Sequence, residues 1–401
     1  MSRLSRSAEL EFIALVAMLF ATIAFSIDAM LPALTQMGRE LTPDAPEKAT
    51  LVVTIFVLGL GVGTFFAGPL SDAFGRKPII LGGFAIYMLG ALWAGLATDL
   101  TGILAGRFLQ GLAMAGPRIA GLAMVRDLYS GERMASIVSF AMTVFALVPA
   151  VAPLVGQSIL NLAGWRWIFF AFTLFAALIG LWLALRRTET LARHNRRRIS
   201  LRDILSAVRE CFGNRVFRYA VATQTLGYAS LFSMISVVQP IYAQTFGVTD
   251  SFPYFFAGAA LLSIPASVVN GRLVLKFGMR FLIKAALVAQ IGLSLMALLA
   301  WSYDVMSVWV FFAWLTCLLF SIGFIFGNLN ALALEPLGHI AGLAASINGA
   351  AATVVSALMA IPVSLSFDGT PLALLIGVLI CAGLAQILML MLGPRQLTQP
   401  A

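Results

Sequence analysis

Apolar runs long enough to cross a lipid bilayer recur along the whole chain, separated by short charged or turn-forming stretches. A helix of about 20 residues spans the hydrocarbon core. Of the 401 residues, 61% are hydrophobic and 11% charged, whereas soluble domains average about 45–50% and about 25%. These values exclude a water-soluble enzyme and predict an all-α integral membrane protein with twelve transmembrane helices. The predicted spans are residues 10–34, 48–71, 78–98, 101–126, 134–161, 166–187, 217–244, 252–275, 280–301, 305–334, 341–366 and 370–392.

Most basic residues lie in connections that would share one side of the membrane. Twenty-one of the 26 Lys and Arg residues fall there, and three, Arg39, Lys48 and Arg166, fall on the opposite side. Cytoplasmic connections carry the excess of Lys and Arg. The bias predicts that both termini are cytoplasmic, and it explains the net charge of +9 without a nucleic-acid partner.

One long polar stretch divides the predicted spans into six and six. It predicts an N-terminal six-helix bundle (1–187), a basic cytoplasmic linker (188–215) that rests on anionic lipid, and a C-terminal six-helix bundle (216–401). A weak repeat supports this division, since GPLSDAFGRK at 68–77 aligns with GRLVLKFGMR at 271–280. Two pseudo-symmetric bundles around a central cavity are the architecture of a transporter whose halves rock about a shared site.

The sequence argues against several classes of function. Cys211, Cys317 and Cys381 lie far apart and form no CxxC pair, which argues against a disulfide framework and a cysteine metal site. No phosphate-binding GxxxxGK[ST] loop occurs, so the chain is not an ATP-driven pump of that kind. Within the spans we find no paired carboxylates and no nucleophile with a base. We therefore expect no enzymatic activity, no cofactor and no metal.

The segment GPLSDAFGRKP at 68–78 resembles the loop signature of the major facilitator superfamily. Other segments narrow the resemblance to the proton-coupled drug exporters of the bicyclomycin/chloramphenicol-resistance type, over residues 12 to 392. These segments are IDAMLPAL (27–34), AGRFLQGL (105–112), MVRDLY (124–129), VPAVAPLVGQ (148–157), WRWIF (165–169) and ALEPLGHIAGLAASING (333–349).

The antiporter motif of the family this chain resembles, Gly-Pro-x-x-Gly-Gly, appears here as Ala-Pro-Leu-Val-Gly-Gln at 152–157. Its first glycine is therefore replaced by Ala152 and its last by Gln157, while Gly156 is kept. Pro149 and Pro153 are expected to bend the fifth span, and Gly156 to permit close packing.

Three charged residues, Asp28, Arg107 and Arg118, lie well inside the predicted spans. A charge at mid-bilayer costs about 2.5–3.5 kcal/mol on insertion scales, so it requires a partner, water or a function. Counting residues from the outer ends places Asp28 and Arg107 both about 9 Å below the outer edge, which predicts that they pair. Asp28 would then bind the coupling proton or a cationic substrate, and Arg107 would adjust its proton affinity. The alternative is a static buried ion pair that orders the bundle.

Arg118 follows Arg107 by eleven residues, which is about three helical turns, so both side chains lie on one stripe of the helix. One interpretation is a cavity arginine that favours anionic or zwitterionic substrates. The other is a structural arginine with a carboxylate or backbone partner. The sequence leaves both open.

A conformational switch is implied by the resemblance at the cytoplasmic end of the second and fourth spans. Its residues are Gly68, Asp72, Gly75, Arg76, Lys77 and Asp127. Asp72 is expected to contact the start of the eleventh span near Ile340 to Gly342 when the cytoplasmic side is closed, because the positive end of a helix dipole attracts a carboxylate. The alternative is a solvated loop that is kept cytoplasmic by its charge.

Together these features predict a secondary transporter of the bacterial inner membrane that exports drugs or other small amphipathic molecules in exchange for protons by alternating access. Its partners would be the small-molecule substrate, protons and the lipid bilayer, and a monomer would suffice. One alternative is a proton-coupled exporter of a dedicated metabolite, such as an amino acid or a sugar. Another is a membrane sensor that does not transport.

Overall fold

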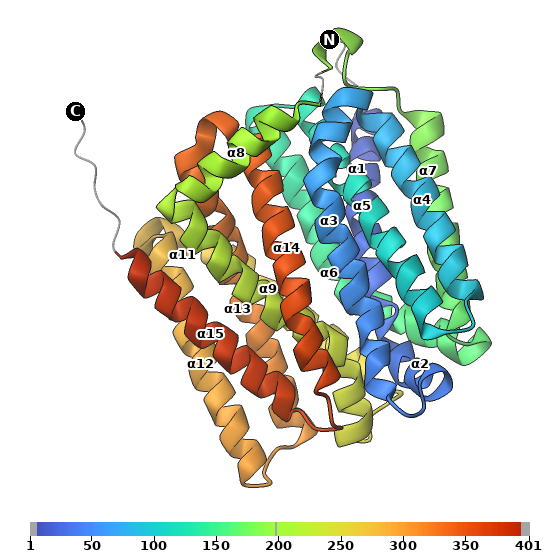
Figure 1. Ribbon diagram of the computed structural model, residues 1–401, viewed down its shortest axis with the longest axis vertical. Helices are drawn as coiled ribbons and strands as arrows, with labels where there is room; N and C mark the ends of the chain where they lie inside the picture. Colours follow the sequence, from blue (N-terminus) through green and yellow to red (C-terminus); the bar gives the residue numbers. More distant parts are fainter. Residues whose placement is uncertain (1–5, 197–198, 394–401) are drawn as a thin grey trace.

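A computed structural model of the chain describes residues 6–196 and 199–393, and in these ranges it is almost entirely helical (Figure 1). Both chain ends and the linker pair Arg197-Arg198 lie outside the described residues, and so do the predictions made for them. The helices are α1 (Arg6–Asp28), α2 (Leu34–Leu41), α3 (Leu51–Phe74), α4 (Arg76–Leu96), α5 (Leu100–Leu128), α6 (Gly131–Ala163), α7 (Arg166–Arg186), α8 (Leu201–Gly213), α9 (Arg215–Pro240), α10 (Phe252–Ser263), α11 (Pro265–Phe277), α12 (Met279–Ser302), α13 (Val308–Leu334), α14 (Ala341–Leu365) and α15 (Leu372–Leu392).

Eleven stretches of the described residues are long and apolar enough to cross a membrane. One of them, Val308–Leu365, contains both α13 and α14, which are joined by the short 3-10 helix η5 (Glu335–Ile340). The prediction of twelve membrane helices is thereby confirmed. In a bilayer each backbone N–H and C=O group needs a partner within the protein, which is why every span is a helix.

The first predicted span, 10–34, is wrong at its outer end. Helix α1 stops at Asp28, and the chain then forms the 3-10 turn η1 (Leu31–Ala33) before α2 begins. Pro32 is the reason: it lacks a backbone N–H, and its ring would clash with the preceding turn of a continuous helix. Asp28 therefore lies at a helix end.

The eighth predicted span, 252–275, is also not one continuous helix. It consists of α10 and α11, which meet at Ile264 directly before Pro265. The cause is again the missing N–H of a proline. The seventh span likewise changes character at its end, where α9 gives way at Pro240 to a π-helical turn, η4 (Ile241–Thr245).

The helices pack as two groups, α1 to α7 and α9 to α15. In the first group α3 and α4 pack on α5, and α1 packs on α6. In the second, α9 packs on α13, α14 and α15. The groups meet where α3 contacts α14, side by side in Figure 1, and where α6 contacts α10. We call the end that carries α8 and Arg76 the linker end, and the end that carries α2 the α2 end.

Helices α3 and α5 approach each other through glycines. A Cβ atom added to Gly59 would overlap the backbone oxygen of Phe108, and one added to Gly111 would overlap that of Phe56. Within a membrane helices gain little from the hydrophobic effect, so close backbone packing at small residues holds them together. This contact fixes the positions of the polar residues on both helices.

Gly111→Ala should therefore destabilise the protein, because the new methyl group meets a backbone atom that cannot move without separating α3 from α5. We expect a cost of about 1–3 kcal/mol, as for other overpacked cores, seen as a lower unfolding temperature in detergent. Gly82→Ala is the matched control, since a Cβ there meets nothing within 4 Å. Equal unfolding temperatures for the two variants would contradict the packing argument.

Candidate functional site

Asp28 is the last residue of α1 and is only 4% exposed. The turn η1 follows it, and the residues from Ala29 to Leu34 are all buried. In the part of the chain that the structure describes, its carboxylate makes no hydrogen bond and no ion pair. Asp28 is thus a buried carboxyl group at the α2 end of the first helix group.

The antiporter-like motif packs against the turn that follows Asp28. A Cβ atom on Gly156 would overlap the backbone oxygen of Ala29, so only glycine permits α6 to lie this close. Pro149 and Pro153 both lie inside α6, which runs unbroken from Gly131 to Ala163. The motif is therefore placed next to the buried carboxyl group.

Arg107 lies on α5 and is fully buried. Its guanidinium N–H groups donate hydrogen bonds to two backbone oxygens and one amide oxygen. Nε donates to the oxygen of Val52 (3.1 Å), Nη2 to that of Ser26 (2.9 Å), and Nη1 to Oε1 of Gln110 (3.1 Å). The guanidinium carbon also lies 4.3 Å from the centre of the Phe56 ring, a cation–π distance.

The predicted ion pair between Asp28 and Arg107 is wrong for this conformation. The two residues do lie at similar depth, since Arg107 bonds to Ser26, two residues before Asp28. The guanidinium instead bonds to carbonyls of α1 and α3, which its planar fork of donors can reach together. Depth in the membrane was predictable, but the direction of the side chain was not.

Arg118 is half-buried and follows Pro117 within α5. Among the described residues it forms no hydrogen bond and no ion pair, so the partner that a structural role requires is absent here. An unpaired guanidinium inside a membrane helix favours an anionic group nearby.

The switch residues form a charged network at the linker end. Arg76 is buried and donates to Ser71, Asp72 and Asp127. The Asp72 side chain is 43% exposed, and within the described residues it does not bond to the start of α14. Gly68 lies at the contact with α14, where an added Cβ would be 3.2 Å from Oγ of Ser346. The predicted contact of Asp72 with Ile340 to Gly342 is absent from this conformation.

Glu189 completes this network, although it was not among the predicted switch residues. Its carboxylate accepts hydrogen bonds from the backbone N–H groups of Arg76 (3.0 Å) and Lys77 (3.1 Å), the first residues of α4. A carboxylate at a helix N-terminus is stabilised by unpaired N–H groups and the helix dipole. Nζ of Lys77 in turn donates to the oxygens of Ala184 and Arg187 at the end of α7.

Gly75 makes this arrangement possible, because its φ of +107° is a backbone conformation that other residues rarely adopt. The sequence signal for Glu189 is an acidic residue two positions after the basic pair Arg186-Arg187 that ends the sixth predicted span.

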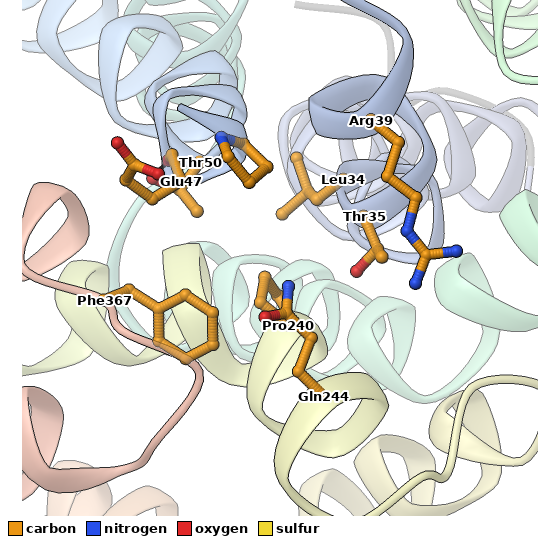
Figure 2. A pocket seen from close by; sticks show the side chains of 9 residues that line it. Leu34, Thr35, Arg39, Glu47, Thr50, Pro240, Gln244 and Phe367 are labelled. Atoms are coloured by element: carbon orange, nitrogen blue, oxygen red, sulfur yellow. Dashed lines mark hydrogen bonds between the residues drawn. The ribbon is translucent and has the colours of Figure 1, made fainter. Parts of the chain in front are cut away.

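At the α2 end two side-chain hydrogen bonds join the helix groups. Thr35 donates to Gln239 (2.8 Å), and the hydroxyls of Thr54 and Ser236 lie 3.0 Å apart. A cavity of about 220 Å³ lies beside them. Figure 2 shows Arg39 and Glu47 from the first group facing Pro240, Gln244 and Phe367 from the second. The molecule is thus held closed at the α2 end.

Comparison with known proteins gives a consistent picture. Residues 14–362 match the sequence profile described as Major Facilitator Superfamily. A Haemophilus influenzae protein named bicyclomycin resistance protein homolog is 31% identical over 84% of this chain and 84% of its own. The multidrug resistance protein MdtL of Salmonella dublin is 26% identical over 91% and 90%. A crystal structure of a D-xylose-proton symporter covers 98% of this chain and 100% of that chain, with a TM-score of 0.76 and 15% identity.

Glu189→Ala should release the start of the linker from α4, because two backbone N–H groups lose their acceptor. We expect faster tryptic cleavage after Arg193 and Arg196 in detergent micelles, by about fivefold or more, as for the loss of a charged hydrogen bond of at least about 1 kcal/mol. The control is Glu132→Ala, which removes an exposed carboxylate with no hydrogen bond among the described residues. Equal cleavage rates would show that Glu189 does not anchor the linker.

Proposed function

This chain belongs to the major facilitator superfamily, and on that basis we propose that it exports small amphipathic molecules in exchange for protons. The proposed exporter lies in the bacterial inner membrane with the linker end in the cytoplasm, as the distribution of Lys and Arg favours. The names of the Haemophilus and Salmonella relatives support drugs as its substrates.

The observation that carries the proposal is the buried carboxyl group of Asp28. Ionisable groups inside a membrane protein are costly and mark ion pathways and proton relays. Asp28 has no ion-pair partner among the described residues, so its charge can change without breaking a structural contact. It is therefore the group that we assign to the coupling proton, and substrate and proton would compete for the region around it.

Arg107 would set the electrostatic surroundings of Asp28 rather than bind the proton. It is held by the carbonyls of Ser26 and Val52, so its positive charge is fixed close to the end of α1. Arg118, which is half-buried and unpaired among the described residues, is the group on α5 that would attract an anionic part of a substrate.

Alternating access requires that the closed end of the molecule can open. The α2 end is closed by two side-chain hydrogen bonds and by apolar packing between the two helix groups, beside a small cavity. In our proposal these separate when the site faces outward, while Asp72 moves to the start of α14 and closes the linker end.

Asp28→Asn should abolish substrate-driven proton movement in proteoliposomes, because the amide cannot bind and release a proton at neutral pH. The measurement uses a pH-sensitive dye inside the vesicles and a panel of cationic, neutral and anionic compounds. Asp44→Asn is the control, since Asp44 is exposed in the loop after α2. Proton movement that persists in Asp28→Asn would remove Asp28 as the proton carrier, and none in wild type with any compound would overturn proton-coupled drug export.

Thr54→Cys combined with Ser236→Cys should lock the α2 end when oxidised, because the two native hydroxyls lie 3.0 Å apart and a disulfide needs closely spaced Cβ atoms. In a background with Cys211, Cys317 and Cys381 replaced by Ser, oxidation should stop transport and reduction should restore it. Each single-cysteine variant serves as a control. Full transport by the oxidised double variant would contradict opening at this end.

A further inference from the structure

The second helix group has a groove along α9 that takes no part in the contacts between the two groups. Its volume is about 480 Å³, and its walls come from α9, α14 and α15, with one residue of α8 at its end. Figure 1 shows α9 between α14 and α15, with α8 at their linker end. We call it the α9 groove, and its main lining residues are Arg218, Val221, Thr225, Val355, Met359 and Leu388.

The walls of the α9 groove are apolar along its length. Apart from Arg218 and Thr225, every residue that lines it is Ala, Val, Leu, Met or Phe. The hydroxyl of Thr225 donates to the backbone oxygen of Val221 (2.9 Å), so its hydrogen is already used. Val355 and Met359 are exposed on the α14 wall. Such a surface suits a hydrocarbon chain and offers little to a polar molecule.

The length of the α9 groove corresponds to one leaflet of a bilayer. It follows α9 from Arg218 to Thr225 for about 10 Å and α14 from Ala351 to Met359 for about 12 Å, at a rise of about 1.5 Å per residue. A hydrocarbon core of about 30 Å gives each leaflet about 15 Å. One acyl chain that enters at the linker end can therefore lie in the groove over most of its leaflet.

Two arginines without a carboxylate partner lie at the linker end of the α9 groove. Arg218 is exposed, and Nη1 donates to the backbone oxygen of Phe212 (2.9 Å). Nη2 of Arg215, one turn earlier on α9, donates to the backbone oxygen of Met391 (2.8 Å). Neither arginine forms an ion pair among the described residues. Their positive charges are thus available to an anionic group outside the protein.

Helix α8 places this charged end at the level of the lipid headgroups. Ala207 and Cys211 of α8 are buried against the second group, whereas the apolar side chains of Leu205 and Phe212 are exposed. A helix with exposed apolar side chains and a polar face lies in the interface of the membrane. Because Phe212 also lines the groove, the groove runs from the headgroup level into the hydrocarbon.

The arginines, and not the apolar walls, determine which lipid is preferred. Lipid tails are as apolar as the side chains that they would cover, so the walls do not distinguish one lipid from another. A guanidinium binds phosphate oxygens with its planar fork of donors. The ammonium of a zwitterionic headgroup would find no free carboxylate beside Arg218, since Glu210 of α8 is bonded to His339 (2.6 Å). Charge complementarity therefore favours a headgroup with a net negative charge.

We propose that the α9 groove binds one anionic phospholipid, with its phosphate on Arg218 and an acyl chain along α9 between α14 and α15. The bound lipid contacts α14, the helix that packs on α3 of the first group. This inference goes beyond the proposed export function. It requires only that the chain lies in a membrane, so it can fail or succeed independently of proton-coupled export.

The test is photolabelling of the full chain in phosphatidylcholine nanodiscs that contain a trace of phosphatidylglycerol with a photoactivatable group in its acyl chain. Phosphatidylcholine with the same group is the contrast probe. After irradiation, mass spectrometry locates the label in the α9 groove and on the exposed apolar face of α12, at Leu295, Met296 and Leu299, which serves as the reference for nonspecific lipid contact.

The variants separate the charge of Arg218 from the space in the groove. Arg218→Gln removes the charge from an exposed residue, so its folding is not at risk, and Arg218→Lys keeps the charge. Val355→Trp fills the groove with a larger side chain. Arg272→Gln is the matched control, since Arg272 is an exposed arginine on α11 of the same helix group and does not line the groove.

In wild type we expect the ratio of groove to α12 labelling to be about fivefold higher for phosphatidylglycerol than for phosphatidylcholine, as for one arginine near an anionic lipid. Arg218→Gln should remove this preference, while Arg218→Lys and Arg272→Gln should keep it. Val355→Trp should reduce groove labelling by both probes.

Three results would overturn the proposal. The first is equal groove labelling of wild type by the two probes, and the second is a preference that persists in Arg218→Gln or groove labelling that persists in Val355→Trp. The third is groove labelling in nanodiscs that hold one chain but not in those that hold two, which would assign the groove to a second copy of the chain.

Discussion

The buried guanidinium of Arg107 is the interaction on which the arrangement of the first helix group depends. It lies on α5 and bonds to the carbonyls of Ser26 on α1 and Val52 on α3. A buried charge that loses its partners is strongly destabilising, so the three helices cannot separate at this level. The glycine contacts between α3 and α5 lie beside it, since Gly111 packs on the backbone of Phe56, whose ring covers the guanidinium.

These contacts of Arg107 fix the backbone around Asp28 but do not involve its carboxylate. Two residues before Asp28, the carbonyl of Ser26 accepts a hydrogen bond from Arg107. Directly after Asp28, the backbone of Ala29 packs against Gly156. The Asp28 carboxylate takes part in neither contact. The end of α1 is therefore rigid in its backbone while the carboxyl group remains chemically free. At the linker end the opposite holds, because the acidic groups Asp127 and Glu189 are used to hold Arg76 and the start of α4. In the proposed cycle the group that exchanges protons has to be a carboxylate without a structural contact, as Asp28 is.

The membrane spans could be predicted, because they depend on composition along the chain. The directions of side chains around a helix and the contacts between distant segments could not. The spans were found because a helix is the only structure that satisfies the backbone of a long apolar run in lipid. The breaks at Pro32 and Pro265 were overlooked because hydropathy does not register a missing N–H. Residue counting placed Asp28 and Arg107 at one level, but it could not show that the guanidinium points to carbonyls. Glu189 was missed because the N–H groups of Arg76 and Lys77, from which it accepts, lie more than 100 positions away.

The two helix groups differ in chemistry, although each consists of six membrane helices and their sequences show a weak repeat. The first carries the buried charges, Asp28 and Arg107, whereas the second carries buried amides, Gln224 and Asn348, and no membrane-embedded charge of comparable burial among the described residues. A charged group responds to protons and an amide does not, so in the proposed export cycle a proton would act on the first group and leave the buried amides of the second unchanged. The two groups meet where α3 packs on α14, so a change at the charges of the first group would reach the second through this contact. In the proposed cycle, coupling between proton and substrate would then require only that the two groups move relative to each other.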